Sequence, residues 1–143
     1  MYYYEASLVR VIDGDTFEAD VDLGFNISQR IVFRLAGCDT PEVRGEERGK
    51  GILVASIVRK WFERHGGNFC VDVREYDKWG RSVAHVAPRG PTYIHASTLS
   101  FFLVKNRLAW RTDSSGKLTE DRDLDLLVSE GFMKEMLGEM DDE

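Results

Sequence analysis

The segment around which this chain is organised reads FRLAGCDTPE and covers residues 33–42. It begins as an apolar strand that carries one arginine, ends at a glycine, and then places two carboxylates within five residues of that end. Arg34 presents a planar fork of hydrogen-bond donors that fits a phosphate group. Asp39 and Glu42 are hard oxygen groups that suit a divalent cation or proton transfer. The segment therefore joins a strand that can be buried to the side chains of a candidate polar site.

Residues 39–42 also have the pattern of an ordinary helix start. Thr40 suits the N-cap position, Pro41 is favoured at the first helical position, and Glu42 would face the positive end of the helix dipole. For an isolated tetrapeptide this structural interpretation is the commoner one. The choice between a helix start and a functional site therefore depends on the rest of the chain.

Length and composition favour one globular domain that spans all 143 residues. No apolar run is long enough to cross a membrane, and the N-terminal residues do not have the pattern of a signal peptide. These features favour a cytoplasmic protein, although a secreted protein that had lost its signal peptide would look the same, and we expect a monomer. Cys38 and Cys70 have no metal-ligand spacing and are expected to be free thiols.

The charge is unevenly distributed along the chain. The net charge is −6, yet residues 120–143 hold ten acidic and two basic side chains, which leaves 15 acidic and 17 basic side chains before them. Because residues 1–119 are weakly basic, the overall negative charge does not exclude a nucleic-acid partner, whose phosphates bind mainly Lys and Arg. The acidic end, at about residues 119–143, is most simply a solvated helix face with a tail.

Alternating apolar residues predict five strands, at residues 6–12, 16–23, 29–36, 69–73 and 81–87. The turn at residues 13–15 joins the first two strands, and residues 24–28 form a second turn that extends into solvent. In the third strand Phe33 and Leu35 lie on one face, so Arg34 points away from the side that they bury.

Apolar residues at helical spacing predict three helices, at residues 49–65, at residues 98–105 and after Thr119. The third helix is expected to pack through a stripe formed by Leu124, Val128, Phe132 and Met136. Five short strands with a helix between the third and the fourth predict a mainly β protein with added helices. The expected fold is a five-stranded OB-fold barrel decorated by three helices, whose loops form a binding face.

Three charged motifs occur at the expected turns: VIDGDT at residues 11–16, FRL followed by DTPE within residues 33–42, and DKWGR at residues 77–81. Within these motifs, Arg34 and Arg81 supply two guanidinium groups, and Asp15, Asp39 and Glu42 supply three carboxylates. Hydrolysis of a phosphodiester needs this set, because a cation must offset the phosphate charge, a water must be deprotonated, and rigid donors must meet the growing negative charge.

In these three motifs the chain resembles the staphylococcal nuclease (thermonuclease) family, in the same order and at similar spacing. A weaker similarity covers residues 103–109, and the resemblance as a whole spans about residues 5–112. The resemblance implies a nuclease domain with an OB fold. It further implies endonucleolytic cleavage of DNA and RNA that leaves 3′-phosphate ends.

The resemblance also implies a metal site and a base. Ca²⁺ would be held by the carboxylates of Asp15 and Asp39 and by the main-chain carbonyl of Thr40, an all-oxygen set that fits a hard cation. Glu42 corresponds to the carboxylate that acts as general base toward a water molecule.

Two arginines and three further residues are expected to contact the substrate. By resemblance, Arg34 and Arg81 grip the scissile phosphate and stabilise its transition state, for which bidentate geometry is important. Trp79 stands where the family has a tyrosine, and its ring can stack on a base beside Lys78. Trp110 is a further candidate for substrate binding.

Two other functions remain open at this point. OB barrels often bind single-stranded nucleic acid on basic and aromatic surfaces without cleaving it, so a non-catalytic binding module is the main alternative. A histidine-metal nuclease would use His65, His85 and His95, but their spacing matches no ligand motif, and histidines that are packed or solvated are the simpler interpretation.

Overall fold

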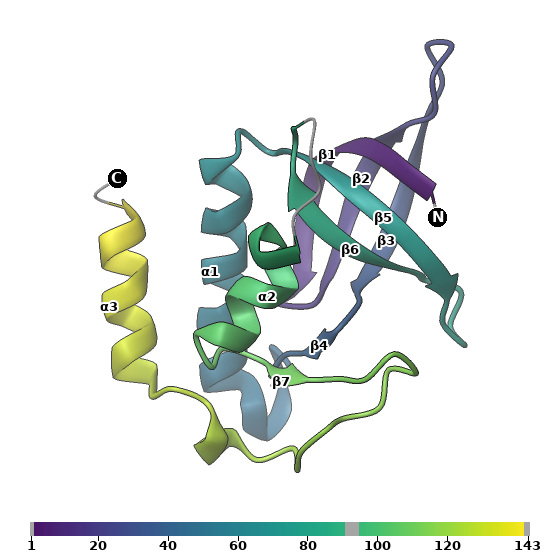
Figure 1. Ribbon diagram of the computed structural model, residues 1–143. Helices are drawn as coiled ribbons and strands as arrows, with labels where there is room; N and C mark the ends of the chain where they lie inside the picture. Colours follow the sequence, from purple (N-terminus) through teal and green to yellow (C-terminus); the bar gives the residue numbers. More distant parts are fainter. Residues whose placement is uncertain (1, 91–94, 142–143) are drawn as a thin grey trace.

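The computed structural model describes residues 2–90 and 95–141, and its centre is a closed barrel of five strands (Figure 1). Around the barrel the strands are hydrogen-bonded in the order β1-β2-β3-β6-β5. Their bounds are β1 (Tyr2–Asp13), β2 (Thr16–Asp22), β3 (Ser28–Leu35), β5 (Asn68–Tyr76) and β6 (Ser82–Pro88). The barrel and its helices confirm the predicted OB-like architecture.

The first three barrel strands form an antiparallel meander whose register follows the alternation in the sequence. Phe17 on β2 lies opposite Phe33 on β3, and each is 1% exposed. A parallel pairing of β3 with β6 and an antiparallel pairing of β1 with β5 close the barrel. The turn between β2 and β3 extends into solvent as predicted, and Phe25 at its tip is 97% exposed.

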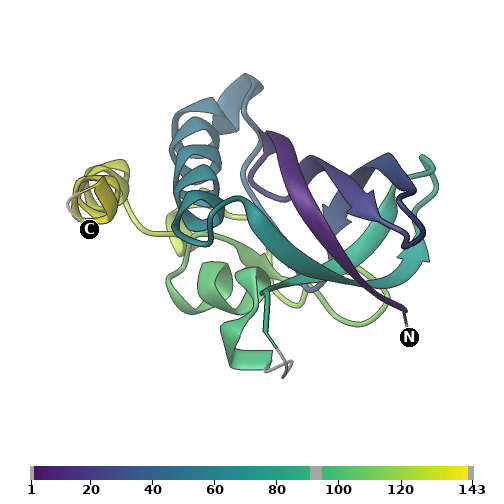
Figure 2. The same cartoon turned by 90° about the horizontal axis from the view of Figure 1, so that it is seen from above.

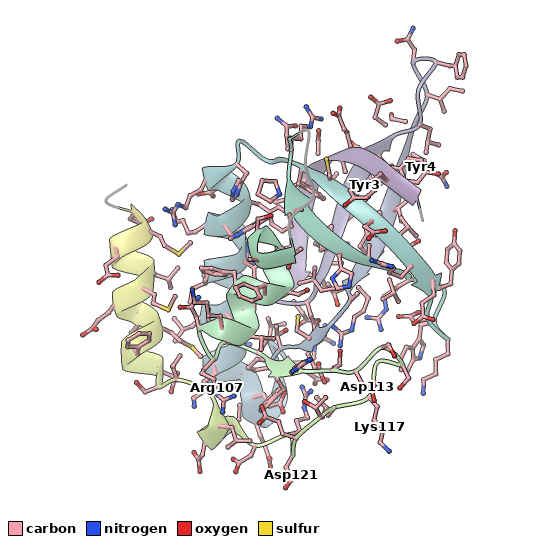
Figure 3. The ribbon with its side chains drawn as sticks, in the orientation of Figure 1. Tyr3, Tyr4, Arg107, Asp113, Lys117 and Asp121 are labelled. Carbon is pink, nitrogen blue, oxygen red and sulfur yellow. The ribbon has the colours of Figure 1, made fainter. Side chains whose placement is uncertain are left out.

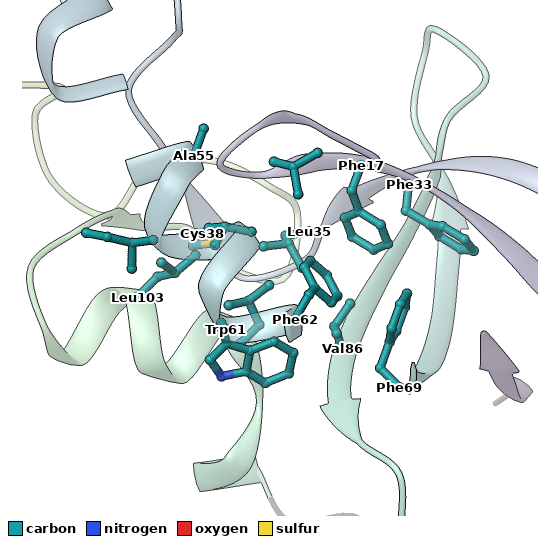
Figure 4. Close-up of a cluster of buried hydrophobic side chains, with 14 of the residues drawn as sticks. Phe17, Phe33, Leu35, Cys38, Ala55, Trp61, Phe62, Phe69, Val86 and Leu103 are labelled. Carbon is teal, nitrogen blue, oxygen red and sulfur yellow. The ribbon is translucent and has the colours of Figure 1, made fainter. Parts of the chain in front are cut away.

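Aromatic rings fill the interior of the barrel (Figure 4). The ring of Phe17 lies 5.4 Å from that of Phe33 and 5.3 Å from that of Phe62, which comes from helix α1 (Arg48–Arg64). Phe69 on β5 lies 4.8 Å from Phe62. Each fully buried side chain of this size contributes about 1.5–3 kcal/mol, so this cluster anchors α1 to the barrel.

The first two helices lie close to their predicted positions. Helix α1 covers the predicted segment at residues 49–65 to within one residue at each end. Helix α2 (Leu99–Lys105) begins at Thr98, whose hydroxyl oxygen accepts a hydrogen bond from the backbone N–H of Phe101. Thr98 is therefore the N-cap of this helix, a position at which threonine is favoured.

The third helix differs from the prediction in its start and in its packing face. A short 3-10 helix occupies residues 124–126, and helix α3 (Glu130–Asp141) begins only after three more residues. The predicted stripe is confirmed for Val128 and Met136, which pack against the core, but it is wrong for Phe132, which is 48% exposed. Met133 is fully buried and Met140 nearly so, and neither was part of the predicted stripe. The non-helical residues before α3 break the continuous helical period that the prediction assumed.

Helix α3 packs on the outer side of α1, which lies between α3 and the barrel (Figure 2). Glu135 and Glu139 on α3 are exposed, as expected for a solvated acidic face, and Lys60 on α1 pairs with Asp141. Residues 142–143 of the predicted acidic tail lie outside the described residues. In residues 2–90 and 95–141, no helix has the length and apolar composition needed to cross a bilayer.

A second, two-stranded sheet lies beside the barrel and was not predicted. It pairs β4 (Cys38–Asp39) with β7 (Trp110–Arg111). The chain leaves β4 as a loop, and the next helical turn begins only at Gly45. Thr40 is therefore not the N-cap of a helix, and the structural interpretation of residues 39–42 as a helix start is wrong.

Candidate active site

Four of the predicted site residues lie in direct contact. The Asp15 carboxylate pairs with the Arg34 guanidinium at 2.8 Å and accepts a hydrogen bond of 2.8 Å from the backbone N–H of Thr40. The other end of the Arg34 fork donates to the Asp39 carboxylate at 3.2 Å. Arg34 therefore bridges two carboxylates that come from different strand ends.

The barrel fixes these contacts through its backbone. Thr16 lies opposite Arg34 in the pairing of β2 with β3, and the backbone N–H of Leu35 donates to the carbonyl of Asp15 at 2.8 Å. Gly37 then adopts a φ of +87°, a left-handed conformation that a glycine adopts without strain, and this turn leads directly into β4. The turn after β1 and the start of β4 are thus held on the same side of Arg34.

Arg81 is held by the turn between β5 and β6. The Asp77 carboxylate accepts hydrogen bonds from the backbone N–H groups of Trp79 and Arg81, and its other oxygen accepts one of 2.6 Å from the Arg81 side chain. Burial opposes ionisation of Asp77, but these hydrogen bonds outweigh it and lower the pKa of the carboxyl. Arg81 also reaches Thr16 at 3.5 Å, which places it beside the Asp15 turn.

Arg34 and Arg81 line the same groove, which has a volume of about 1240 Å³. Five Lys or Arg residues and three Asp or Glu residues line it, so the groove is basic although the protein as a whole is acidic. Lys78 and Trp79 stand at its edge, where Trp79 is 70% exposed and the Lys78 ammonium lies 4.5 Å from the centre of the indole ring. A positive groove with an exposed aromatic ring suits a polyanion that carries bases.

Glu42 lies close to this centre but does not contact it. Its backbone N–H donates to the Glu47 carboxylate at 2.9 Å, and the next backbone N–H, that of Val43, donates to Asp13 at 3.2 Å. The Glu42 side chain is exposed, and its carboxylate forms no hydrogen bond or ion pair with any residue in the described part of the chain. The loop is therefore fixed through its backbone, while the carboxylate remains open to solvent.

Arg122 is the site residue that the sequence analysis missed. Its guanidinium pairs with Asp39, donates to the carbonyl of Thr40 at 3.2 Å and forms two hydrogen bonds of 2.7 and 2.9 Å with Glu47. It also lies over the ring of Trp110, 4.4 Å from the ring centre. Burial lowers the pKa of Arg122, but the contacts with Glu47 and Asp39 outweigh this effect and raise it.

The signal for Arg122 was present in the sequence but weak. Residues 120–125 read EDRDLD, so a single arginine stands in a run of acidic side chains that favours a solvated surface. Its three acidic or carbonyl partners lie between residues 39 and 47, and no local pattern connects those positions with residue 122. Only the fold brings the two segments together.

Trp110 is not exposed at the surface as Trp79 is. It is fully buried, its indole N–H donates to the carbonyl of Asp123 at 3.0 Å, and Arg122 covers its ring. Backbone pairing of β4 with β7 sets it directly opposite Asp39. Trp110 is therefore a support for the acidic centre, and in this conformation its ring cannot stack on a base.

The electrostatics of the centre favour a cation. Burial and the charge of Asp15 raise the pKa of Asp39 to about 6, and the guanidinium groups of Arg34 and Arg122 offset only part of this effect. Both effects disfavour the ionised Asp39 carboxylate, and a cation close to the two carboxylates would oppose them. The oxygen atoms of Asp15, Asp39 and the Thr40 carbonyl are also the donor type that a hard cation prefers.

The oxygen donors at this centre are of the type that Ca²⁺ prefers, but their arrangement does not form a complete metal site. The Thr40 hydroxyl is buried and has no hydrogen-bond partner among the described residues, so this residue carries one further unsatisfied oxygen. In residues 2–90 and 95–141, however, no group of three or more His, Cys, Asp or Glu side chains has the spacing of a metal site. The expected ligands are present, and guanidinium groups currently satisfy them.

The histidines do not form an alternative centre among the described residues. Nδ1 of His65 lies 2.7 Å from the carbonyl of Trp61 at the end of α1, whereas His85 lines the groove from β6. The side chain of His95 lies outside the part of the chain that can be described.

Comparison with known proteins adds no family assignment to this geometry, because no protein-family model and no curated protein matches the sequence.

Proposed function

We propose that this protein is a Ca²⁺-dependent nuclease that hydrolyses phosphodiester bonds of DNA and RNA. The observation that carries the proposal is the place of Arg34 and Arg81 in one basic groove, beside the paired carboxylates of Asp15 and Asp39. A phosphodiester is the substrate that uses both features, since its phosphate needs rigid donors and its hydrolysis needs an acidic centre that can hold a cation.

Arg34 and Arg81 are held by different carboxylates and are proposed to bind the same phosphate. Each guanidinium can offer paired N–H groups to the non-bridging oxygens of one phosphate, whose negative charge grows in the transition state. Asp15, Asp39 and the Thr40 carbonyl would hold the ion. When bound, Ca²⁺ supplies positive charge beside the phosphate and favours deprotonation of water.

Glu42 is the proposed general base, because its carboxylate is exposed and free to accept a proton. Its exposed carboxylate takes a proton from the attacking water, and the water oxygen forms a bond to phosphorus. The bond from phosphorus to the 5′ oxygen breaks, and that oxygen takes up a proton. The products are a 3′-phosphate end and a 5′-hydroxyl end.

Lys78 and Trp79 are proposed to hold the nucleotide next to the scissile phosphate. The exposed ring of Trp79 offers a stacking surface that accepts any base, and the Lys78 ammonium beside it meets a neighbouring phosphate. This arrangement favours single-stranded substrates, in which the bases are free to stack.

The proposal is tested with single-stranded DNA and RNA, incubated with Ca²⁺ or with a chelator. We expect Glu42→Gln and Arg81→Ala to lose most of the Ca²⁺-dependent cleavage. The matched controls are Glu46→Gln, which removes an exposed carboxylate from the same loop region, and Arg89→Ala, which removes an arginine that pairs only weakly with Glu5 at 3.6 Å. Both controls should cleave like the wild type.

Three outcomes would contradict this mechanism or replace it. Cleavage that persists in the chelator would exclude the metal, and cleavage that survives in both site variants would exclude the assigned residues. Binding of single strands without any cleavage would favour the alternative function, a non-catalytic OB-fold module that binds single-stranded nucleic acid.

A further inference from the structure

The guanidinium of Arg122 contacts the same oxygens that the proposed function assigns to the metal. It pairs with the Asp39 carboxylate and donates to the Thr40 carbonyl, which are two of the three expected Ca²⁺ ligands. We propose that Arg122 is a built-in counter-ion which the divalent cation must displace before it can bind. The inference rests on the proposed function and adds a regulatory contact to the same site.

The contact is built into the fold and is more than a chance surface pair. The strap, which we define as residues 119–127, lies between β7 and α3 in the chain (Figure 1) and reaches the acidic centre through Arg122. Trp110 holds the strap through two contacts: its ring packs against the Arg122 guanidinium, and its indole N–H donates to the carbonyl of Asp123. On the far side of Arg122, the Lys50 ammonium donates to the carbonyl of Leu124 at 2.7 Å.

Arg122 and a metal ion exclude each other for a physical reason. A bound cation would be coordinated by the same Asp39 and Thr40 oxygens to which the guanidinium now donates, so the two groups compete for these oxygens. Two positive charges on one carboxylate oxygen would also repel each other in a partly buried site. The Arg122 side chain is 29% exposed, so the guanidinium has a short path to solvent when it leaves.

Glu47 connects this exchange with the loop of the proposed base. One Glu47 oxygen accepts hydrogen bonds from both Arg122 and the backbone N–H of Glu42. When Arg122 leaves, Glu47 keeps the contact with Glu42 and regains an uncompensated negative charge beside the metal ligands. Release of the strap therefore makes the centre more attractive to a cation and leaves the loop of Glu42 in place.

The direct test is a calorimetric titration of the intact protein with Ca²⁺, compared with Arg122→Gln. We expect the variant to bind Ca²⁺ about tenfold more tightly or better, because a hydrogen bond to a charged group is worth at least that factor. Lys117→Gln is the matched control, since it removes one positive charge from the segment that leads to the strap. Figure 3 shows the Lys117 side chain pointing away from the body of the protein. The Ca²⁺ affinity of Lys117→Gln should therefore stay within about twofold of that of the wild type.

A second measurement needs no variant and follows the strap in the wild-type protein. The backbone N–H of Leu126 is hydrogen-bonded to Asp123 within the strap, and that of Thr119 to Arg111. We expect Ca²⁺ to speed amide hydrogen exchange in the strap, while exchange in the barrel strands is unchanged. Equal Ca²⁺ affinity in Arg122→Gln and wild type, or slower strap exchange with Ca²⁺, would overturn the proposal.

These results separate the inference from the proposed function. Tighter Ca²⁺ binding in Arg122→Gln without any cleavage would support the counter-ion and reject the nuclease. Cleavage whose Ca²⁺ dependence is the same in Arg122→Gln and wild type would support the nuclease and reject the counter-ion. Absence of Ca²⁺ binding in both proteins would reject both.

Discussion

Gly51 offers the sharpest test of how α1 positions the loop of Glu42. A Cβ atom at this position would lie 1.9 Å from the Glu42 carbonyl oxygen and 2.4 Å from its carbon, whereas ordinary contact begins at 3.4 Å. Both partners are backbone, so no side-chain rotation relieves the overlap. In Gly51→Ala the helix and the loop must therefore separate by about 1.5 Å.

The substitution has opposing effects on stability and one clear effect on the site. Alanine favours the helix by about 1 kcal/mol over glycine, while the forced separation costs about 1–3 kcal/mol. The net loss of unfolding free energy should therefore be only about 0–2 kcal/mol. On the proposed function, we expect kcat/KM for cleavage to fall about 100-fold, because a displacement of about 1 Å in an active site can cost that factor in rate.

The assay combines cleavage kinetics with urea unfolding and amide exchange. Gly138→Ala in α3 is the matched control, since its Cβ would meet no atom within 4 Å and it should gain stability without losing activity. Faster exchange of the backbone N–H of Val43, which now bonds to Asp13, would report the displaced loop independently of any activity. If Gly51→Ala kept the wild-type exchange rate at Val43 and an activity within about threefold of the wild type, the claim that α1 positions the loop of Glu42 would be refuted.

Three further predictions concern the thiols, the turn before β6 and the core. Cys38 and Cys70 are free thiols, as predicted. Iodoacetamide should alkylate Cys70 well before Cys38, because full burial raises the pKa of Cys38 to about 12, and mass spectrometry can follow the order of alkylation. Asp77→Asn should lower the urea midpoint at pH 7, and since the folded pKa of Asp77 is lowered, this deficit should shrink as the pH falls below about 4 and the wild-type carboxylate is protonated. Phe62→Ala should cost about 3–5 kcal/mol of unfolding free energy, and a loss below about 1 kcal/mol would contradict its central place in the core.

Local sequence patterns were enough to predict the barrel and most of the acidic centre. Alternation of apolar residues sets which face of a strand is buried, so the burial of Phe33 and the outward direction of Arg34 follow from the sequence alone. The three charged motifs each sit at a turn of that barrel, and closure of the sheet brings Asp15, Arg34 and Asp39 into contact. The role of these residues as metal ligands and catalytic groups remains a prediction.

The remaining features depend on contacts between distant segments. The pairing of β4 with β7 involves two residues on each side, which is too short for any periodic signal. Burial of Trp110 follows from that pairing, and the docking of Arg122 follows from the burial of Trp110. The predicted start of α3 is wrong because the apolar spacing typical of a helix continues through residues 124–129, whereas the structure has only a short 3-10 helix before Glu130.

If the proposed function holds, the arrangement around Arg34 predicts that the cation and the substrate bind in a linked way. In the present conformation the Arg34 fork is used by Asp15, Asp39 and the carbonyl of Cys38. A phosphate can engage this fork fully only when the carboxylates have another counter-ion, so each ligand should tighten the other by the same factor. On the proposed function, a mononucleotide should therefore bind more tightly with Ca²⁺ than with a chelator, and Asp39→Asn should remove the difference. Equal mononucleotide affinity under both conditions would mean that Arg34 serves the carboxylates alone, and that Arg81 carries the phosphate without it.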